Sequence, residues 1–408
     1  MKAIFLNKRN RVQYYCFIFL FFLLACEENE PVSEINENKY LLEFEQISSI
    51  DANQLRGVAQ IFQPSFDVSA IQYNSDIYKI TYQSEYRGED VVTSGLVCIP
   101  AAAKTTDFPL LLGFHPSISS QDEAPSSFSD NLQSGVELFG ALGFITVIPD
   151  YIGFGSSSSL PHPFLVREAM SKNSVDMLLA VEELLAELEQ IYRKEVSMIG
   201  YSQGGYNAVA TLRHFENEQP LEEWQVVATA AGGGTYDLDE MKQQIFQQQR
   251  YDAPQNIAFL IYSYHEYYDF DGSFDQYFQE AYTDFIPTAF GNDLTLGQIK
   301  GRLTSDLEQL LEPSFLNELR TNSETDFNDA LSENSIIPWQ VQSPLHIYHA
   351  TKDSVINIEN SRSFYKEIEA MGSQQLNYTE LTEPSTHTNA GAPMLLDGIL
   401  WILENQNL

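Results

Sequence analysis

The sequence predicts an α/β fold in which helices cover both faces of a mostly parallel sheet. Three observations support this prediction: short, almost wholly apolar segments recur along the chain, helical patterns lie between them, and Gly200-Tyr201-Ser202-Gln203-Gly204 connects one apolar segment to a helical pattern. Strands that are buried on both faces are apolar throughout, and their alternation with helices is typical of parallel sheets. No Pro-, Gly- or Ser-rich linker divides the chain, so we expect one large core with an insertion.

The predicted elements follow one another in a regular order. Two β-rich segments at residues 77–82 and 91–99 are separated by Arg87-Gly88-Glu89-Asp90, which favours two antiparallel strands at an edge of the sheet. An amphipathic pattern at residues 167–192 predicts the longest helix. The buried strands are expected, in chain order, at residues 110–114, 144–148, 196–199, 226–230 and 345–348, and a further strand and the C-terminal helix at 376–381 and 394–403.

The alternation of strands and helices stops between residues 235 and 337, after the sixth predicted strand. This segment is polar and rich in Tyr and Phe, and it contains two or three short predicted helices, such as residues 296–311. Because ligands in open α/β sheets bind at the carboxyl ends of the strands, we predict a helical cap over that edge. We expect its rings to face the site; the alternative is that they only pack the cap onto the sheet. The rings are those of Tyr262, Tyr264, Tyr267, Tyr268, Phe270, Phe274, Tyr277 and Phe278.

Residues 1–26 have the pattern of an export signal. Basic side chains precede the apolar residues 14–25, which are too few to span a membrane, and Leu23-Leu24-Ala25-Cys26 is similar to a bacterial lipobox, in which Cys26 becomes lipidated after cleavage. An ordinary signal peptide with an incidental cysteine is the alternative. The predicted divisions are a signal peptide at residues 1–25, an acidic tether at 26–45, an α/β core at 46–234 and 338–408, and the cap at 235–337.

Charge and cysteine content exclude several classes of function. The chain carries 57 acidic and 22 basic residues, and removal of the basic signal makes it more acidic still. Nucleic acids are therefore not expected as ligands, because phosphate binding needs clustered Lys and Arg. Cys16 leaves with the signal and Cys26 is the predicted lipidation site, so Cys98 has no partner for a disulfide. We expect neither a metal site nor a cofactor.

Ser202 is the candidate nucleophile. It lies between the predicted strand at residues 196–199 and the helical pattern at 206–215. A serine hydroxyl becomes reactive when a strained strand-to-helix turn holds it, and the elbow residues Gly200, Tyr201 and Gly204 include the glycines that such a turn needs. The alternative interpretation is an ordinary turn that contains a serine.

His387 and Asp353 are the candidate base and acid. His387 follows the strand at residues 376–381 and precedes the C-terminal helix, so its loop should emerge at the edge that carries the nucleophile. Asp353 follows the strand at residues 345–348, and the order serine, aspartate, histidine is the one found with nucleophile elbows of this kind. Asp353 could instead cap a turn, in which case Glu359 is the alternative acid.

An oxyanion needs two hydrogen-bond donors. The backbone N–H of Gln203, at the start of the helix, is expected to supply one. The other should come from the loop after residues 110–114, where Pro116 has no N–H, so Ser117 is the candidate.

These motifs together resemble the secretory lipase branch of the α/β-hydrolases. Residues 148–155 are similar to the P-D-Y-x-G-x-G signature, His162-Pro163-Phe164 to the H-P-Y segment, and Glu123-Ala124-Pro125-Ser126 to an E-A-P-S turn. One departure is that Phe114-His115-Pro116-Ser117 stands where the family usually has Gln-His-Gly-Thr, which removes a glycine N–H from the oxyanion loop. The resemblance covers about residues 75–405 and implies hydrolysis of carboxylic esters, from triacylglycerols to short acyl or acetyl esters.

The resulting hypothesis is a lipid-anchored serine esterase outside the cytoplasm. Ser202 would attack the ester carbonyl, His387 would accept and return the proton, and Asp353 would orient the imidazole during formation of an acyl-enzyme. The expected partners are a lipid or small-molecule ester and, through the anchor, a bacterial membrane. The alternatives are an esterase that removes acyl or feruloyl groups from carbohydrates, a serine peptidase, and a binding protein that has the fold without turnover.

Overall fold

One nine-stranded sheet organises the chain. The computed structural model describes residues 39–62, 67–128, 135–290, 293–323, 325–383 and 385–406. The predicted signal peptide, the lipidation site Cys26 and the tether up to residue 38 lie outside these residues. The strands are β1 (Leu41–Ile50), β2 (Asn74–Tyr86), β3 (Glu89–Ala101), β4 (Phe108–Phe114), β5 (Ile145–Pro149), β6 (Tyr192–Tyr201), β7 (Gln225–Gly232), β8 (Leu345–Ala350) and β9 (Leu376–Leu381).

The sheet is mostly parallel, as the sequence predicts. Its order is β1-β2-β3-β5-β4-β6-β7-β8-β9, in which the pairs from β5 through β4 to β9 are parallel and β1, β2 and β3 form an antiparallel edge. β1 was not expected: Leu41 pairs with Tyr82 of β2. Residues 41–45 therefore belong to the sheet, and the predicted tether boundary at residue 45 is wrong. Because of this extra strand, the sixth predicted strand is β7.

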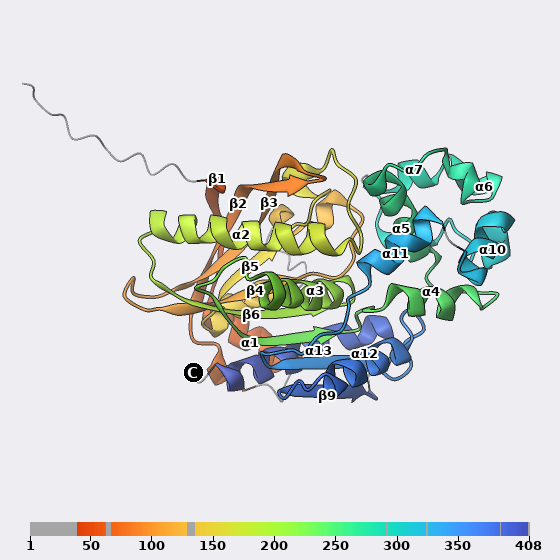
Figure 1. Cartoon of the computed structure of the whole chain (residues 1–408). Helices are drawn as coiled ribbons and strands as arrows, with labels where there is room; N and C mark the ends of the chain where they lie inside the picture. Colours follow the sequence, from red (N-terminus) through yellow and green to blue (C-terminus); the bar gives the residue numbers. More distant parts are fainter. Residues whose placement is uncertain are drawn as a thin grey trace, which may run out of the picture. The chain divides into compact units, whose positions relative to one another are not determined.

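Helices cover both faces of the sheet (Figure 1). The core helices are α1 (Ala52–Phe62), α2 (Arg167–Glu187), α3 (Gln203–Glu218), α12 (Ile358–Ala370) and α13 (His387–Asn405), and the short 3-10 helices are η1 (Val68–Ala70), η2 (Gln121–Glu123), η3 (Pro125–Ser127), η4 (Val136–Leu142), η5 (Gly155–Ser157) and η6 (Phe274–Gln276). Side chains alternate along β6: Val196 and Met198 pack into the cluster that contains α2 and α3, whereas Ile199 and Tyr201 pack into the cluster that contains α13. This alternation buries both faces of the sheet.

Several predicted boundaries differ from those in the structure. α2 ends at Glu187, because β6 begins at Tyr192 and not at residue 196. α13 begins at His387 instead of residue 394 and accommodates Pro393 within it. The helix expected at residues 296–311 is two short helices, because a turn follows α8 and Asp306 caps the first amides of α9.

Between β7 and β8 the described residues form helices and loops with two isolated β-bridges, Arg250 with Asp306 and Phe278 with Leu311, and no strand. Figure 1 shows these helices together, beyond the ends toward which the parallel strands run. Buried Lys242 of α4 joins them by binding Asp239, Asn322 and Asn328. The helices are α4 (Leu238–Phe246), α5 (Pro254–Tyr268), α6 (Glu280–Thr283), α7 (Ile286–Ala289), α8 (Leu296–Lys300), α9 (Leu307–Leu310), α10 (Pro313–Thr321) and α11 (Asp326–Asn334).

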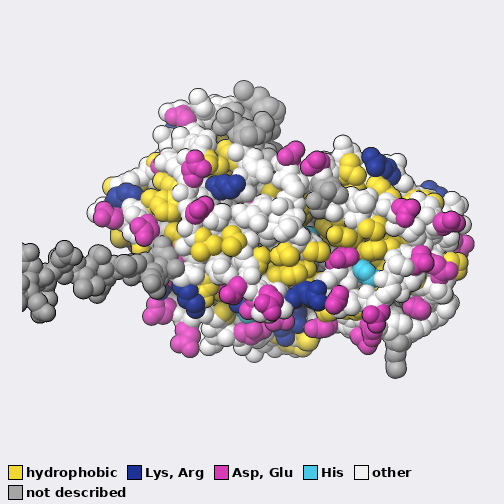
Figure 2. Space-filling model, turned by 90° about the horizontal axis from the view of Figure 1, so that it is seen from above, with side chains coloured by type: hydrophobic (Ala, Val, Ile, Leu, Met, Phe, Trp, Pro, Cys, Tyr) yellow, Lys and Arg dark blue, Asp and Glu magenta, His cyan; other side chains and the backbone are white. Residues whose placement is uncertain are grey.

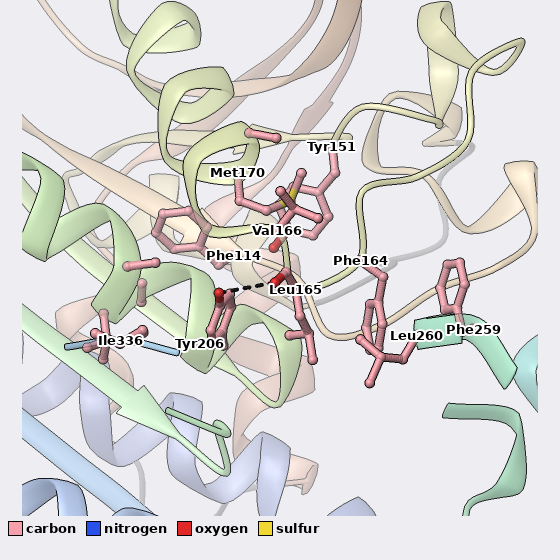
Figure 3. Packing of buried hydrophobic residues seen from close by; sticks show 14 of the residues in the cluster. Phe114, Tyr151, Phe164, Leu165, Val166, Met170, Tyr206, Phe259, Leu260 and Ile336 are labelled. Carbon is pink, nitrogen blue, oxygen red and sulfur yellow. Dashed lines mark hydrogen bonds between the residues drawn. The ribbon is translucent and has the colours of Figure 1, made fainter. Parts of the chain in front are cut away.

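The cap packs onto the core through the segment that precedes α2. Phe164 stacks on Phe259 of α5 with a centroid separation of 4.8 Å, and Figure 3 shows Leu260 beside the Phe164 ring. The Tyr206 hydroxyl of α3 donates to the Leu165 carbonyl at 3.2 Å (Figure 3). These contacts hold α5 against the helix that starts at the nucleophile elbow.

Candidate active site

Ser202 lies on the strained turn that the sequence predicts, between β6 and α3. Its backbone has φ 59° and ψ −121°, which is unfavourable for a residue with a side chain. Its N–H donates to the Gly232 carbonyl of β7 at 2.8 Å. Gly200 and Gly204 are required for close packing, since a Cβ on Gly200 would lie 2.2 Å from the Gly204 oxygen and one on Gly204 would lie 2.2 Å from the Phe114 oxygen.

The structure brings Ser202, His387 and Asp353 into one hydrogen-bonded chain. The His387 Nε2 lies 2.8 Å from the Ser202 Oγ, and its Nδ1 lies 2.6 Å from the Asp353 Oδ2. The three side chains come from the turn after β6, the first residue of α13 and the loop after β8. In this arrangement Nδ1–H donates to the carboxylate, which leaves Nε2 free to accept the serine proton.

Asp353 combines both roles that the sequence left open. Its Oδ1 accepts hydrogen bonds from the backbone N–H groups of Val355 and Ile356, each at 2.8 Å, while Oδ2 faces His387. One oxygen therefore shapes the loop and the other contacts the imidazole. Burial raises the pKa of the Asp353 carboxyl, but hydrogen bonds from His349 and His387 outweigh it and hold this pKa well below its usual range.

His349 is a second histidine at this carboxylate, and the sequence analysis missed it. The fully buried imidazole accepts from the Ser361 hydroxyl at Nδ1 (2.7 Å), and its Nε2 lies 3.0 Å from the Ile356 oxygen and 3.4 Å from the Asp353 Oδ2. Its position four residues before Asp353, at the end of β8, was a signal that could have found it. The alternative acid, Glu359, is instead paired with Arg362.

The two predicted oxyanion residues, Ser117 and Gln203, line the same pocket as Ser202. The Gln203 side chain donates to the Nε2 of His162 at 2.8 Å, and the His162 Nδ1–H donates to the Ile152 carbonyl at 2.7 Å. Burial lowers the pKa of His162 to about 3, so the imidazole is neutral and can accept from the amide. His162 thus orients the residue after the nucleophile; the His-Pro-Phe segment was its sequence signal.

The departure from the family at residues 114–117 is accommodated by packing of His115. Its ring stacks on Tyr151 with a centroid separation of 3.9 Å, and the Tyr151 hydroxyl donates to the His115 carbonyl at 3.0 Å. Buried Asp150 also stabilises this region, because its Oδ1 accepts from the Ser126 N–H at 2.7 Å. Asp150 and Tyr151, which follow β5, therefore hold in place the loop that carries Ser117.

The pocket at Ser202 is small and mainly apolar. It is partly open to the surface and has a volume of about 40 Å³. Residues of the cap helices α4 and α5 form much of its wall, opposite the elbow. The lining residues are Ser117, Phe164, Leu165, Ser202, Gln203, Gly233, Thr235, Met241, Ile245, Phe246, Tyr251, Asn256, Ile257, Leu260 and Ile356.

The prediction that the cap rings face the site is wrong: none of those eight rings is among the described lining residues of this pocket. They pack on one another and on neighbouring helices, as in the stacking of Tyr268 on Phe270 at 5.6 Å and the contact of Tyr277 with Phe315 at 4.9 Å. The rings form the core of the cap, and the pocket is lined instead by other cap side chains, which include Met241, Ile245 and Leu260 and the aromatic Phe246 and Tyr251.

The described residues contain neither a candidate metal cluster nor a helix that could span a membrane. Within them, His, Cys, Asp and Glu side chains form no group of three or more that could hold a metal ion. No helix in the described ranges has the length and apolar character needed to cross a bilayer. Figure 2 shows acidic side chains spread over one face and not gathered at a single site.

A comparison of the sequence with protein families gives one match. The sequence profile of the secretory lipase family matches residues 136–406, which include Ser202, Asp353 and His387. No curated protein matches the chain in sequence.

Solved structures share the fold at low sequence identity. A protein of Legionella pneumophila described as a hydrolase is 21% identical, with a TM-score of 0.83 over 90% of this chain and 98% of its own. LipA of Xanthomonas oryzae, a rice cell wall degrading esterase, is 20% identical, with a TM-score of 0.78 over 91% and 98%. Lipase A of Candida antarctica in its closed state is 15% identical, with a TM-score of 0.65 over 90% and 82%.

Proposed function

The chain belongs to the secretory lipase family, and from this premise we propose that it is a serine esterase that hydrolyses carboxylic esters outside the cytoplasm. The observation that carries the proposal is the hydrogen-bonded chain from Ser202 through His387 to Asp353, which opens onto an apolar pocket. An apolar pocket beside the nucleophile suits the acyl part of an ester.

The geometry supports the following sequence of steps. The Ser202 Oγ attacks the ester carbonyl while the His387 Nε2 accepts its proton, and Asp353 stabilises the imidazolium that forms. The N–H groups of Gln203 and Ser117 would bind the oxyanion. His387 then returns the proton to the departing alcohol, which leaves an acyl-enzyme. Water, deprotonated by the same histidine, hydrolyses this intermediate and regenerates Ser202.

We further propose that Cys26 carries a lipid anchor after cleavage of residues 1–25. The lipobox-like Leu23-Leu24-Ala25-Cys26 and the basic and apolar segments before it support this proposal. The polar residues that follow Cys26 would then separate the catalytic part from the bilayer.

The proposed activity is tested with p-nitrophenyl esters, a p-nitroanilide amide and a fluorophosphonate probe. We expect ester hydrolysis, little or no amide hydrolysis, and labelling of Ser202 identified by mass spectrometry. Ser202→Ala is the matched control and should lose both the label and the activity. A protein that is folded but neither labels nor hydrolyses any ester would instead be a binding protein with this fold.

A further inference from the structure

A second cavity lies behind one wall of the pocket at Ser202. It has a volume of about 260 Å³, against about 40 Å³ for the pocket. Met241, Ile245 and Tyr251 line both spaces, so these three side chains separate them. We refer to these three residues as the acyl wall. The other residues of the second cavity are Gln244, Gln248, Arg250, Asp252, Asp353, Ser354, Val355 and Asn357.

The acyl wall is buried and held in place from both sides. Met241 and Ile245 are four residues apart on α4, so their side chains share one face of the helix. The Tyr251 hydroxyl donates to the Val355 carbonyl at 2.9 Å, and its N–H donates to the Ser305 carbonyl at 2.9 Å. The exposed fractions are 7% for Met241, 6% for Ile245 and 4% for Tyr251, so the wall is almost completely surrounded by other protein atoms.

The size of the pocket limits what the nucleophile can accept. A water needs about 10–15 Å³ measured in this way, so the pocket holds about three waters, or an acyl group of about two to four carbons. The ends of longer chains would meet the acyl wall. Close packing of the interior resists the displacement of these side chains.

We propose that the acyl wall is the acyl-length stop of this enzyme, which restricts it to esters of short carboxylic acids. The inference rests on the proposed esterase function and adds the chain length of its substrate and the residues that set it. It also predicts that removing part of the wall joins the pocket to the second cavity, so that a long acyl chain can pass through.

The test compares p-nitrophenyl esters of acetate, butyrate, octanoate and laurate. In the wild type we expect kcat/KM to fall by about tenfold or more between butyrate and octanoate, since the size limit acts on transition-state binding. In Ile245→Ala and in Met241→Ala we expect the octanoate-to-butyrate ratio of kcat/KM to rise by about fivefold or more.

Three further variants complete the test. Leu260→Ala enlarges the pocket at a residue that does not line the second cavity, so it should raise kcat/KM for the butyrate ester but not for the laurate ester. Phe270→Ala alters the aromatic core of the cap away from both spaces; it should lower the melting temperature and leave the chain-length profile unchanged. Ile245→Trp fills the pocket and should reduce butyrate hydrolysis more than acetate hydrolysis, which keeps the test valid where an alanine variant fails to fold.

The outcomes separate the two proposals. Ester hydrolysis by a wild type that cleaves laurate as well as butyrate overturns the acyl-length stop and leaves the esterase function intact. The same follows if folded Ile245→Ala, Met241→Ala and Ile245→Trp all keep the wild-type profile. Absence of ester hydrolysis, together with absence of fluorophosphonate labelling, overturns the esterase function and the stop with it.

Discussion

The Tyr201 hydroxyl donates a hydrogen bond to the backbone carbonyl of His387 at 2.7 Å. Tyr201 is the residue directly before the nucleophile, and its ring lies 5.3 Å from the imidazole, centroid to centroid. The Tyr201 side chain thereby connects the elbow after β6 to the first residue of α13. This contact sets where the candidate base lies relative to Ser202 without involving either reacting atom.

Removing this hydrogen bond should slow the reaction without weakening substrate binding. For Tyr201→Phe we expect kcat to fall by about three- to tenfold, with KM changed less than about twofold, because the ring remains and only the position of His387 becomes less defined. The free energy of unfolding should fall by about 1 kcal/mol. Steady-state kinetics and denaturant titration measure both quantities, and an unaltered kcat would show that the contact does not position the base.

The three residues of the hydrogen-bonded chain should act as a unit. Ser202→Ala and His387→Ala should remain folded and lose nearly all activity, and Asp353→Asn should be the least severe of the three. The double variant Ser202→Ala/His387→Ala should be about as inactive as either single variant. A double variant whose loss equals the product of the single losses, or an Asp353→Asn protein that keeps more than half its activity, would contradict the assigned roles.

His349 should influence the reaction through Asp353. In His349→Gln we expect a fall in kcat of about tenfold, because the carboxylate loses a hydrogen-bond donor and the loop after β8 loses a contact. Asp353 then interacts more strongly with His387, so the acidic limb of the kcat/KM profile should move to higher pH. Ser361→Ala is the control, which keeps the imidazole and should show a smaller effect. A lower melting temperature with an unmoved pH profile would assign His349 a structural role alone.

Buried His162 should make the fold less stable as the pH falls below neutrality. Burial lowers its pKa to about 3, well under the usual value near 6.5. Between these two pH values the unfolded chain binds a proton at His162 that the folded chain does not. The contribution of neutral His162 to the free energy of unfolding is therefore fully present above pH 6.5 and decreases as the pH falls toward 3. The expected slope is about 1.4 kcal/mol per pH unit for this group.

Denaturant unfolding between pH 7 and pH 4.5 measures this dependence. The decline should be shallower in His162→Gln than in the wild type. Parallel curves for the wild type and His162→Gln would contradict the pKa of His162.

The anchor predicted at Cys26 can be separated from catalysis. Cys26→Ser should abolish lipidation and move the protein from the membrane to the soluble fraction, with no change in specific activity, because the residue lies far in sequence from every side chain at the active site. Fractionation and mass spectrometry of the mature N-terminus test this. A wild-type N-terminus without an acyl group, with membrane association retained in Cys26→Ser, would exclude the anchor.

Much of the candidate active site could be predicted from the sequence because its signals are local. The residues around Ser202 specify a turn whose glycines have no room for a Cβ, and the strand-like segments before Asp353 and His387 specify strands that end at one edge of the sheet. Chain order alone then predicted which loops would meet. β1 escaped prediction because Leu41–Ile50 is an edge strand whose side chains, apart from Leu41, are exposed or half-buried, so it lacks the apolar run of the buried strands.

The sequence by itself predicted every strand of the sheet except β1, together with the elbow and the three residues that meet at it. Only the tertiary structure decided which side chains of the cap face Ser202. Eight aromatic residues marked the cap, yet they pack among themselves, while Met241, Ile245 and Leu260 line the pocket. Hydrophobicity predicts that a side chain is buried but not against which partner, since that depends on how the short helices of the cap pack together. The same reason hid His349 and His162, whose roles arise from contacts with Asp353 and Gln203 across the fold.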